Sequence, residues 1–241
     1  HIRLPTQAEP DVQSWSKEAG VRMVTLAPEL DGALDLIRDL VARGVVVSAG
    51  HSSATRDQAV AGFDAGITYA THLFNAMAPL GHREPGLAGA ALADARVTVG
   101  IIPDGIHMHP DIVRIVNRAT GEDRLSLVTD ATAGMGMAPG RYLLGERDVV
   151  LDGTSVRLAG DGRLAGSALT ADEALRRFVE MTGATVASAV ATMTTTPARL
   201  LGLADRGFVG PGAPADLALF TPGLDLVATF VGGQPVHGPW E

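Results

Sequence analysis

Two histidines have the surroundings of metal ligands. His51 follows an apolar run in the motif Ser-Ala-Gly-His-Ser, and His72 follows the apolar residues 67–70. The residues between them, 55–66, have the pattern of one amphipathic helix. A strand–helix–strand unit of this kind places both histidines at the carboxyl ends of neighbouring parallel strands. In α/β folds, that edge of the sheet binds ligands and metals.

A carboxylate arrives in the same way, because the apolar residues 125–129 end at Asp130. Neutral imidazole binds Zn²⁺ well, and a coordination position left open holds a water whose pKa falls towards about 7. An adjacent carboxylate can take the proton of this water and return it to a leaving amine. A lone histidine at a strand end is more often a polar residue satisfied in a turn. The prediction of a hydrolytic metal site therefore depends on all three residues together.

Composition limits the classes of protein to consider. The chain has 241 residues, of which 46% are apolar and 19% charged, and no apolar run is long enough to span a membrane. The net charge is −8 and no basic cluster occurs, which argues against nucleic acid as a partner. Cysteine is absent, so any metal must be held by histidine and carboxylate.

Strands and helices alternate up to Asp130. We expect strands over 21–27, 45–49, 67–71, 97–102 and 125–129. We expect helices over 10–19, 32–43 with Asp31 as its N-cap, 55–65 and 110–119, and a Gly- and Pro-rich loop over 78–89. This alternation predicts an α/β fold with a parallel sheet, as in a TIM-like (β/α)8 barrel of the metal-dependent hydrolase type. A full barrel takes about 250 residues, so we expect the N-terminal strands to be absent.

The pattern changes after Asp130. Short hairpin strands are expected over 142–144, 149–151 and 156–158, with a turn at Asp152-Gly153, as an insertion at about 140–160. Helices follow over 171–182, opened by a capping box of Thr170 and Glu173, and over 186–194 and 197–202. Residues 216–220 and 226–231 alternate like antiparallel strands. We therefore expect a barrel portion carrying the metal site over 1–207 and part of a small β-sandwich over 208–241.

Six motifs carry a family resemblance that runs from about Val24 to the C-terminus. In order, they are Ala-Gly-His-Ser at 49–52, Ala-Thr-His-Leu-Phe-Asn-Ala-Met at 70–77, Arg-Glu-Pro-Gly-Leu-Ala-Gly at 83–89, Asp-Gly-Ile-His at 104–107, Val-Thr-Asp-Ala at 128–131 and Leu-Ala-Gly-Ser at 164–167. In this order and spacing the chain resembles the N-acetylglucosamine-6-phosphate deacetylases of the amidohydrolase superfamily. Any one motif would be weak, whereas six in order are specific.

The resemblance implies hydrolysis of the N-acetyl group of N-acetyl-D-glucosamine 6-phosphate to D-glucosamine 6-phosphate and acetate, in the amino-sugar metabolism of the cytoplasm. It implies a divalent metal, Zn²⁺ or alternatively Fe²⁺, Mn²⁺ or Co²⁺, on His51 and His72, with Asp130 as the catalytic carboxylate. It also implies a homodimer in which Arg83 reaches the neighbouring subunit's site. The residues implied to hold the sugar phosphate are Asn75, Ala76, Arg83, His107, Leu164, Ala165 and Gly166.

The chain departs from the family in one respect. The resemblance implies a further metal ligand, a glutamate on an earlier loop, followed by a histidine that polarises the substrate carbonyl. Neither matches a residue of this sequence, since residues 2–5 align a few positions past that histidine and His1 is therefore not it. We expect that these two residues precede the sequence.

Three functions remain open at this point. The first is the deacetylase, and the second is another amidohydrolase, such as a dihydroorotase-like enzyme or an amino-acid deacylase. Arg83, in its Gly- and Pro-rich loop, and His107 favour the first, because a neutral substrate needs no clamp for an anion. Without the motif around it, Arg83 would be read as a solvated surface residue, and His107 could merely cap the next helix. The third function is an inactive sugar-phosphate-binding module.

Overall fold

The structure, a computed structural model, describes residues 12, 14–153 and 155–239. The chain forms two compact units. The first combines residues up to 101 with 116–126 and 199–202, and the second combines 102–115, 127–198 and the residues from 203 onward. Each unit is thus assembled from segments that are distant in the sequence.

A five-stranded sheet with the order β1-β2-β3-β4-β5 contains all five strands expected before Asp130. Its strands are β1 (Met23–Leu26), β2 (Val46–Ala49), β3 (Ile67–Ala70), β4 (Thr98–Ile101) and β5 (Leu125–Leu127). The pairs β1–β2, β2–β3 and β3–β4 are parallel. Apolar side chains such as Val47, Val99 and Ile101 are fully buried, as in a parallel sheet covered on both faces. The sheet fits the expected portion of a TIM-like barrel.

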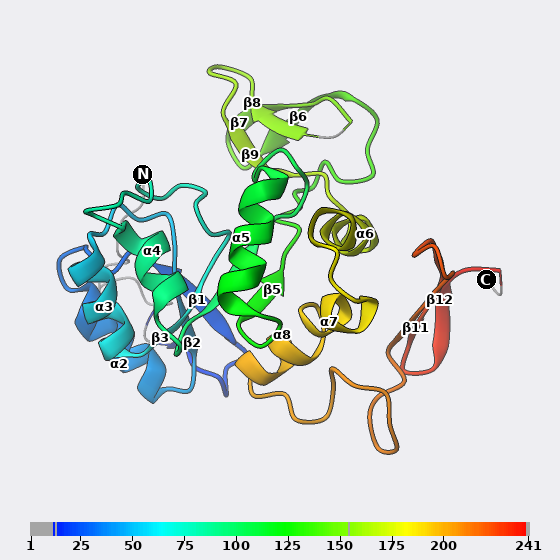
Figure 1. Cartoon of the computed structure of the whole chain (residues 1–241), viewed down its shortest axis with the longest axis horizontal. Coiled ribbons are helices and arrows are strands. Elements are labelled where there is room, and N and C mark those ends of the chain that lie inside the picture. The colour runs from blue at the N-terminus through cyan, green and yellow to red at the C-terminus, as the bar shows by residue number, and fades with distance from the viewer. Residues whose placement is uncertain (1–11, 13, 154, 240–241) are drawn as a thin grey trace. The chain divides into compact units, whose positions relative to one another are not determined.

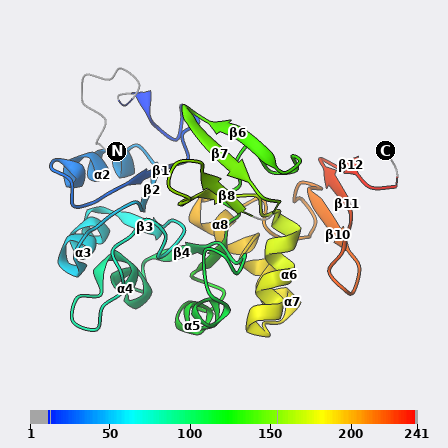
Figure 2. The same cartoon turned by 90° about the horizontal axis from the view of Figure 1, so that it is seen from above.

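Three helices of the first unit follow one another along the sheet (Figures 1 and 2). Helix α2 (Ala33–Ala42) packs on β2, α3 (Arg56–Ala65) on β3 and α4 (Gly86–Ala93) on β4. Helix α5 (Pro110–Thr120) includes residues of both units. Within the described part of the chain, no helix is long and apolar enough to cross a membrane.

Some expectations for the first unit were wrong. Asp31 does not cap α2, because the N-cap position is occupied by Gly32. Gly32 has a left-handed φ of 80°, and no side chain caps the helix. The loop expected over 78–89 ends at Pro85, where α4 begins; its Gly- and Ala-rich sequence hid a buried helix. The helix expected over 10–19 is only partly confirmed: residues 12 and 14 are helical, residues 10, 11 and 13 lie outside the described residues, and 17–20 form a turn.

The second unit contains an antiparallel sheet with the order β6-β7-β8-β9. Its strands are β6 (Gly140–Leu144), β7 (Arg147–Leu151), β8 (Ser155–Leu158) and β9 (Leu164–Ser167), the last of which was not expected as a strand. Val149, Leu151 and Val156 form its buried core. The helices that follow are α6 (Ala171–Thr182), α7 (Val186–Ala191) and α8 (Thr195–Leu200), the last of which includes residues of both units.

The expected capping box of α6 is absent. Thr170 occupies the N-cap position but makes no side-chain hydrogen bond to the helix. Glu173 instead accepts hydrogen bonds from the guanidinium groups of Arg176 and Arg177, one turn further along the helix. These hydrogen bonds, first from Arg177 and then from Arg176, hold the pKa of Glu173 below its usual range. Glu173 therefore forms ion pairs with the two arginines and does not take part in a capping box.

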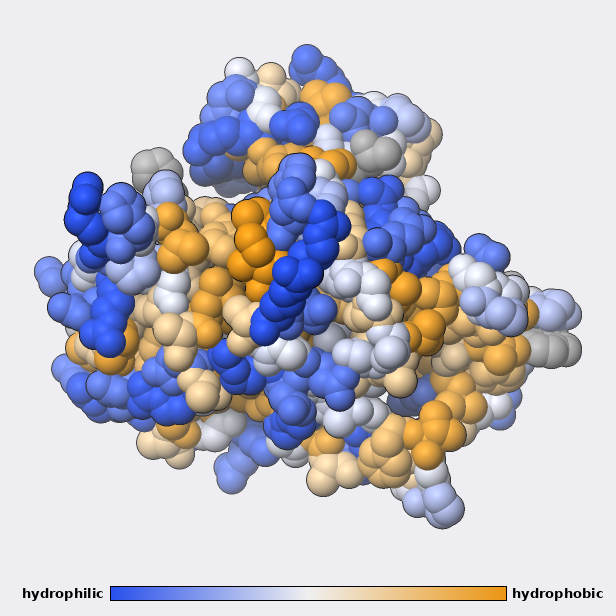
Figure 3. Space-filling view, viewed as in Figure 1, coloured by the Kyte–Doolittle hydropathy of each residue, from blue (hydrophilic) through white to orange (hydrophobic). Residues whose placement is uncertain are grey.

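The last sheet has the order β10-β11-β12 and is antiparallel. Its strands are β10 (Leu217–Phe220), β11 (Leu226–Val231) and β12 (Gln234–His237). Large apolar side chains stay exposed on it and on the loop before it, among them Phe208, Val209 and Val231, and Figure 3 shows this hydrophobic surface. A sheet of three short strands that leaves such side chains exposed buries little apolar area of its own.

Candidate active site

The structure brings the two predicted metal ligands together. His51 and His72 each follow a strand by two residues, and these strands, β2 and β3, are parallel neighbours. The Nε2 atoms of the two rings lie 2.9 Å apart, and the ring planes are nearly perpendicular at 76°. His72 is buried, whereas His51 is exposed. Two imidazole nitrogens thus face each other at the carboxyl edge of the sheet.

Left-handed backbone occurs at several of the predicted site residues. Among the non-glycine residues that the structure describes, six have a positive φ. Four of them are predicted site residues: His51 (49°), His72 (29°), Ala76 (52°) and Asp130 (51°). This conformation costs roughly 1–2 kcal/mol per residue relative to right-handed backbone. Such conformations cluster at functional sites, where the surrounding structure holds them in place.

Glu29 holds the loop that carries His51. It lies just beyond β1, and its two carboxylate oxygens accept hydrogen bonds from the Ser52 hydroxyl at 2.6 Å and the Ser53 N–H at 2.7 Å. These two serines directly follow His51. The sequence analysis missed this residue, although the strand preceding a carboxylate is the same signal that identified Asp130. Glu29 therefore supports the loop of the first predicted metal ligand.

Asn75 and Gly50 support the turn of His72. The Asn75 side-chain amide donates to the carbonyl oxygens of His72 and Leu73, both at 3.2 Å. A Cβ on Gly50 would collide with the side chain of Thr71, the residue before His72. Asn75, predicted to hold the sugar phosphate, thus also holds the backbone of the predicted ligand.

Arg83 lies in a closed turn of the first unit. The Glu84 carboxylate accepts hydrogen bonds from the N–H groups of Arg56 at 2.7 Å and Gly86 at 2.9 Å, and so joins this turn to the start of α3. The Gly81 N–H donates to the Glu84 carbonyl at 3.0 Å, which closes the turn. The Arg83 side chain itself is exposed. The loop is anchored, and its guanidinium is available to an anion.

In the second unit, Asp130 lies against Gly166 and Ser167 at the end of β9. The Ser167 N–H donates to the Asp130 carbonyl at 2.8 Å, and the Ser167 hydroxyl donates to the carbonyl of Thr129. Gly166 has a left-handed φ of 71°, and a Cβ on it would lie 2.8 Å from the Asp130 carbonyl oxygen. A glycine is therefore required there. The structure brings these predicted site residues together through their backbones.

His107 forms a buried pair with Asp104 in the second unit. Its Nδ1 lies 2.6 Å from Asp104 Oδ2, and both side chains are only 4% exposed. The other carboxylate oxygen, Oδ1, accepts from the N–H groups of Ile106 and His107. Burial raises the pKa of Asp104, but these hydrogen bonds together outweigh burial and place the pKa below its usual range. The carboxylate is ionised, and Nδ1 of His107 is its donor.

Comparison with known proteins identifies the family. Residues 5–236 match the amidohydrolase family. The chain belongs to this family. It is 41% identical over 231 residues to an N-acetylglucosamine-6-phosphate deacetylase of Danio rerio, covering 93% of this chain and 57% of that protein. It is 42% identical over 215 residues to an N-acetylgalactosamine-6-phosphate deacetylase of Escherichia coli O157:H7, covering 89% of this chain and 56% of that protein.

Solved structures agree with this assignment. An N-acetylglucosamine-6-phosphate deacetylase of Thermotoga maritima has a TM-score of 0.91 at 34% identity, over 99% of this chain and 64% of that chain. A variant enzyme of Mycobacterium smegmatis in complex with N-acetyl-D-glucosamine-6-phosphate has a TM-score of 0.87 at 43% identity, over 91% and 59%. The amidohydrolase chain spans about half the length of the curated relatives it matches.

Amidohydrolases generally use a divalent metal ion. Two Zn–N bonds of about 2.1 Å at a tetrahedral angle would separate the two nitrogens by roughly 3.4 Å. The observed separation of 2.9 Å between His51 Nε2 and His72 Nε2 needs only a small opening to match. Within residues 12, 14–153 and 155–239, no group of three or more His, Cys, Asp or Glu side chains could hold a metal ion. The histidine pair thus fits as two nitrogen ligands of a site and does not complete one.

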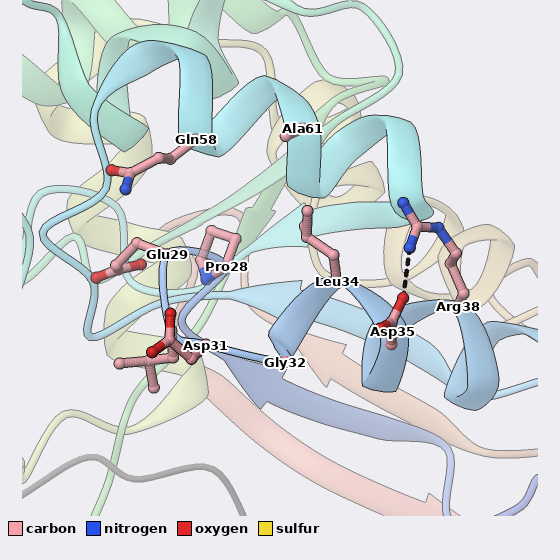
Figure 4. A pocket seen from close by; sticks show the side chains of 10 residues that line it. Pro28, Glu29, Asp31, Gly32, Leu34, Asp35, Arg38, Gln58 and Ala61 are labelled. Carbon is pink, nitrogen blue, oxygen red and sulfur yellow. Dashed lines mark hydrogen bonds and ion pairs between the residues drawn. The ribbon is translucent and has the colours of Figure 1, made fainter.

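A pocket of about 410 Å³ opens in the first unit (Figure 4). Glu29 lines it from the end of β1 and Gln58 from α3, while Arg38 on α2 donates to Asp35 at 2.8 Å. None of the predicted site residues is among its lining residues. Glu29 thus borders this pocket while its carboxylate holds the loop of His51.

Proposed function

We propose that this amidohydrolase chain hydrolyses the N-acetyl group of N-acetyl-D-glucosamine 6-phosphate, releasing acetate and D-glucosamine 6-phosphate. The observation that carries the proposal is the His51–His72 pair on its strained turns, a pair of nitrogen ligands held ready at the edge of a parallel sheet. Relatives named as this deacetylase, at about 40% identity over most of the chain, support the choice of reaction.

The roles of the residues follow from their chemistry. His51 and His72 would hold the divalent ion as neutral imidazoles, Zn²⁺ being the first choice and Fe²⁺, Mn²⁺ or Co²⁺ the alternatives. When bound, such an ion supplies electrophilic activation of the amide carbonyl and of a water molecule. Asp130 takes the proton of the attacking water and passes it to the amine that leaves, so that the C–N bond breaks as the sugar amine forms.

The remaining predicted residues hold the substrate. Arg83 would bind the phosphate through its guanidinium, whose donors match two phosphate oxygens at once. Its exposed position on an anchored turn suits a residue that serves the site of a second subunit, so we include a homodimer in the proposal. Asn75, Ala76, His107 and Leu164–Gly166 would contact the sugar phosphate.

The 4-epimer is a second candidate substrate. One relative, at 42% identity, is an N-acetylgalactosamine-6-phosphate deacetylase. The phosphate, the N-acetyl group and the reaction are the same for both sugars, so the residues proposed above serve either one. Only the contacts to the 4-hydroxyl can discriminate between them.

An assay of acetate release tests the proposal, with the two N-acetylated sugar 6-phosphates and unphosphorylated N-acetylglucosamine as substrates. Arg83→Ala should raise KM for the phosphorylated sugar by about 10- to 100-fold, the loss of a charge-assisted hydrogen bond. It should change KM for the unphosphorylated sugar little. Arg56→Ala is the matched control, since Arg56 is an exposed arginine whose side chain pairs only with Asp57 among the described contacts.

The outcomes separate the alternative functions. Release of acetate with a phosphate-specific effect of Arg83→Ala supports the deacetylase. An equal loss for both kinds of substrate would reject the phosphate clamp and favour another amidohydrolase. Binding of the sugar phosphate without any turnover, in metal-loaded protein, would show an inactive binding module.

A further inference from the structure

The Asp104 carboxylate makes more hydrogen bonds to its neighbours than His107 would need if it only contacted a ligand. Each of the three described contacts to the Asp104 carboxylate comes from residue 106 or 107: two backbone N–H groups bind Oδ1, and His107 Nδ1 binds Oδ2. The two oxygens therefore have different duties. Oδ1 fixes the backbone of the turn, and Oδ2 fixes the ring of His107.

This division determines the tautomer of the ring. An ionised carboxylate only accepts hydrogen bonds, so His107 Nδ1 must carry a proton in both the neutral and the charged ring. The Nε2 atom is then a hydrogen-bond acceptor in the neutral ring and a charged donor in the protonated ring. In water, without the Asp104 carboxylate, a histidine ring is held neither in one orientation nor in this tautomer.

We propose that Asp104 is a positioning residue that locks His107 in the Nδ1–H form, so that Nε2 meets the sugar phosphate as an acceptor for a sugar hydroxyl in the neutral ring and as a charged donor to the phosphate in the protonated ring. This inference rests on the function proposed above for the identity of the ligand, but not for the state of the ring. Asp104 acts only through His107 and through the turn that both residues share.

Helix α6 holds the same turn from behind. Arg177 donates from its NH1 to the Asp104 carbonyl at 2.7 Å, and its Nε donates to Glu173 at 2.6 Å. The chain Glu173–Arg177–Asp104–His107 thus runs from the first turns of α6 to the imidazole. A second layer of this kind is what keeps a ring in one orientation when its ligand is absent.

Asp104→Asn inverts the tautomer without removing the turn. Because Oδ1 accepts from two N–H groups, the asparagine oxygen must take that position, and its NH₂ group must face His107. The amide donates there, so the neutral ring must accept at Nδ1 and carry its proton on Nε2. The variant thus keeps the hydrogen bonds of the turn and reverses only the one to the ring.

Nitrogen-15 NMR of the histidine rings tests this directly and requires no turnover. The His107 signals, identified by their loss in His107→Gln, should show Nδ1–H in the native protein and Nε2–H in the neutral ring of Asp104→Asn. His109 is the internal control: its described contacts are to Asp111 and not to Asp104, so its ring signals should be the same in both proteins. The same His107 tautomer in both proteins would overturn the proposal.

Binding of D-glucosamine 6-phosphate, measured by calorimetry, tests the purpose of the tautomer. Asp104→Asn should raise Kd about 10- to 100-fold, the usual effect of removing an orienting partner. In a His107→Gln background, the same substitution should change Kd less than about twofold, because Asp104 then has no ring to position. Equal effects in both backgrounds would overturn the proposal, even if the tautomer is inverted.

The two measurements separate this inference from the proposed function. Acetate release that fails in the native protein, with the tautomer inverted by Asp104→Asn as expected, would reject the deacetylase and leave the lock on His107 standing. Normal acetate release with an unchanged tautomer would reject the lock alone.

Discussion

Each unit contains one pair of side chains with a histidine in it, His51–His72 in the first and Asp104–His107 in the second. The two pairs show how the partner determines what an imidazole can do. In the first unit, His51 faces His72, and their Nε2 atoms lie 2.9 Å apart. In the second unit, His107 faces a carboxylate at 2.6 Å. Two imidazoles can share one proton or one cation, whereas an imidazole and a carboxylate satisfy each other.

The two pairs also differ in their backbone conformation and in the groups that hold their turns. His51 and His72 both have left-handed φ values, and separate groups, Glu29 and Asn75, hold their turns. His107 is not among the described non-glycine residues with a positive φ, and the partner of its ring also binds its backbone. The strained pair is held by two residues outside it, Glu29 and Asn75, whereas in the relaxed pair Asp104 alone contacts both the ring and the backbone N–H of His107.

The largest effect expected from this comparison is on metal content. His72→Asn should lower metal affinity by more than about 100-fold, since loss of an outer partner alone costs 10–100-fold. His107→Asn should leave metal content unchanged and weaken only the binding of sugar phosphate. Elemental analysis of both variants decides the matter. Equal metal loss in the two proteins would mean that the pairs do not have the separate roles we assign.

Asp130→Asn should remove proton transfer and leave both pairs intact. We expect kcat to fall by roughly 10²–10⁴, with little change in metal content or in the affinity for the product. Steady-state kinetics and elemental analysis on the same samples measure both. Asp148→Asn, another exposed aspartate of the second unit, is the matched control. If kcat stayed within a few-fold of its native value, another group would have to accept the proton.

Glu29→Gln tests the support of the His51 turn. The glutamine oxygen can still accept from the Ser53 N–H and its NH₂ group can donate to the Ser52 hydroxyl, but both hydrogen bonds lose the charge of the carboxylate and hold the loop less strongly. We expect metal affinity to fall by about tenfold, less than for His72→Asn. Asp31→Asn is the control, because Asp31 lines the same pocket. Metal titrations of the three proteins would contradict this role if Glu29→Gln matched the native affinity.

The sequence predicted the histidine pair and the strands because both follow from local rules. An apolar strand that ends in a histidine, repeated on the next parallel strand, can only deliver the two rings to one edge of the sheet. The capping box of α3, in which the Thr55 hydroxyl accepts from the Gln58 N–H, is equally local, although the sequence analysis did not predict it. Six motifs in order then predicted the family, which the comparisons confirmed.

The errors arose where distant partners decide. Thr170 and Glu173 have the spacing of a capping box, yet Arg176 and Arg177 compete for the carboxylate. Helix α4 has no amphipathic stripe to detect, because its small residues are almost all buried. The position of Glu29 after a strand was a local signal, but its role was not predictable, because its hydrogen-bond partners lie more than twenty residues further along the chain. No local pattern records which distant group will approach.

The last prediction has the smallest effect at neutral pH. It concerns Tyr69, on the strand that leads to His72. Tyr69 on β3 is buried, and burial raises its pKa to about 12 from the usual 10. Below pH 10 the phenol is neutral in both folded and unfolded chains. Between pH 10 and 12 the unfolded chain loses the proton first, so the stability that this group contributes falls as pH rises, by at most about 3 kcal/mol.

Tyr69→Phe should abolish this part of the alkaline loss. Denaturant unfolding of the native protein and the variant at pH 9 and pH 12 measures it, and the difference between the two proteins cancels the other titrating groups. If the free energies of unfolding of the two proteins differed by the same amount at pH 9 and at pH 12, Tyr69 would ionise as readily in the folded chain as in water. Because phenylalanine keeps the ring beneath the turn of His72, metal content at neutral pH should stay unchanged, which separates the stability of the scaffold from the chemistry of the pair it carries.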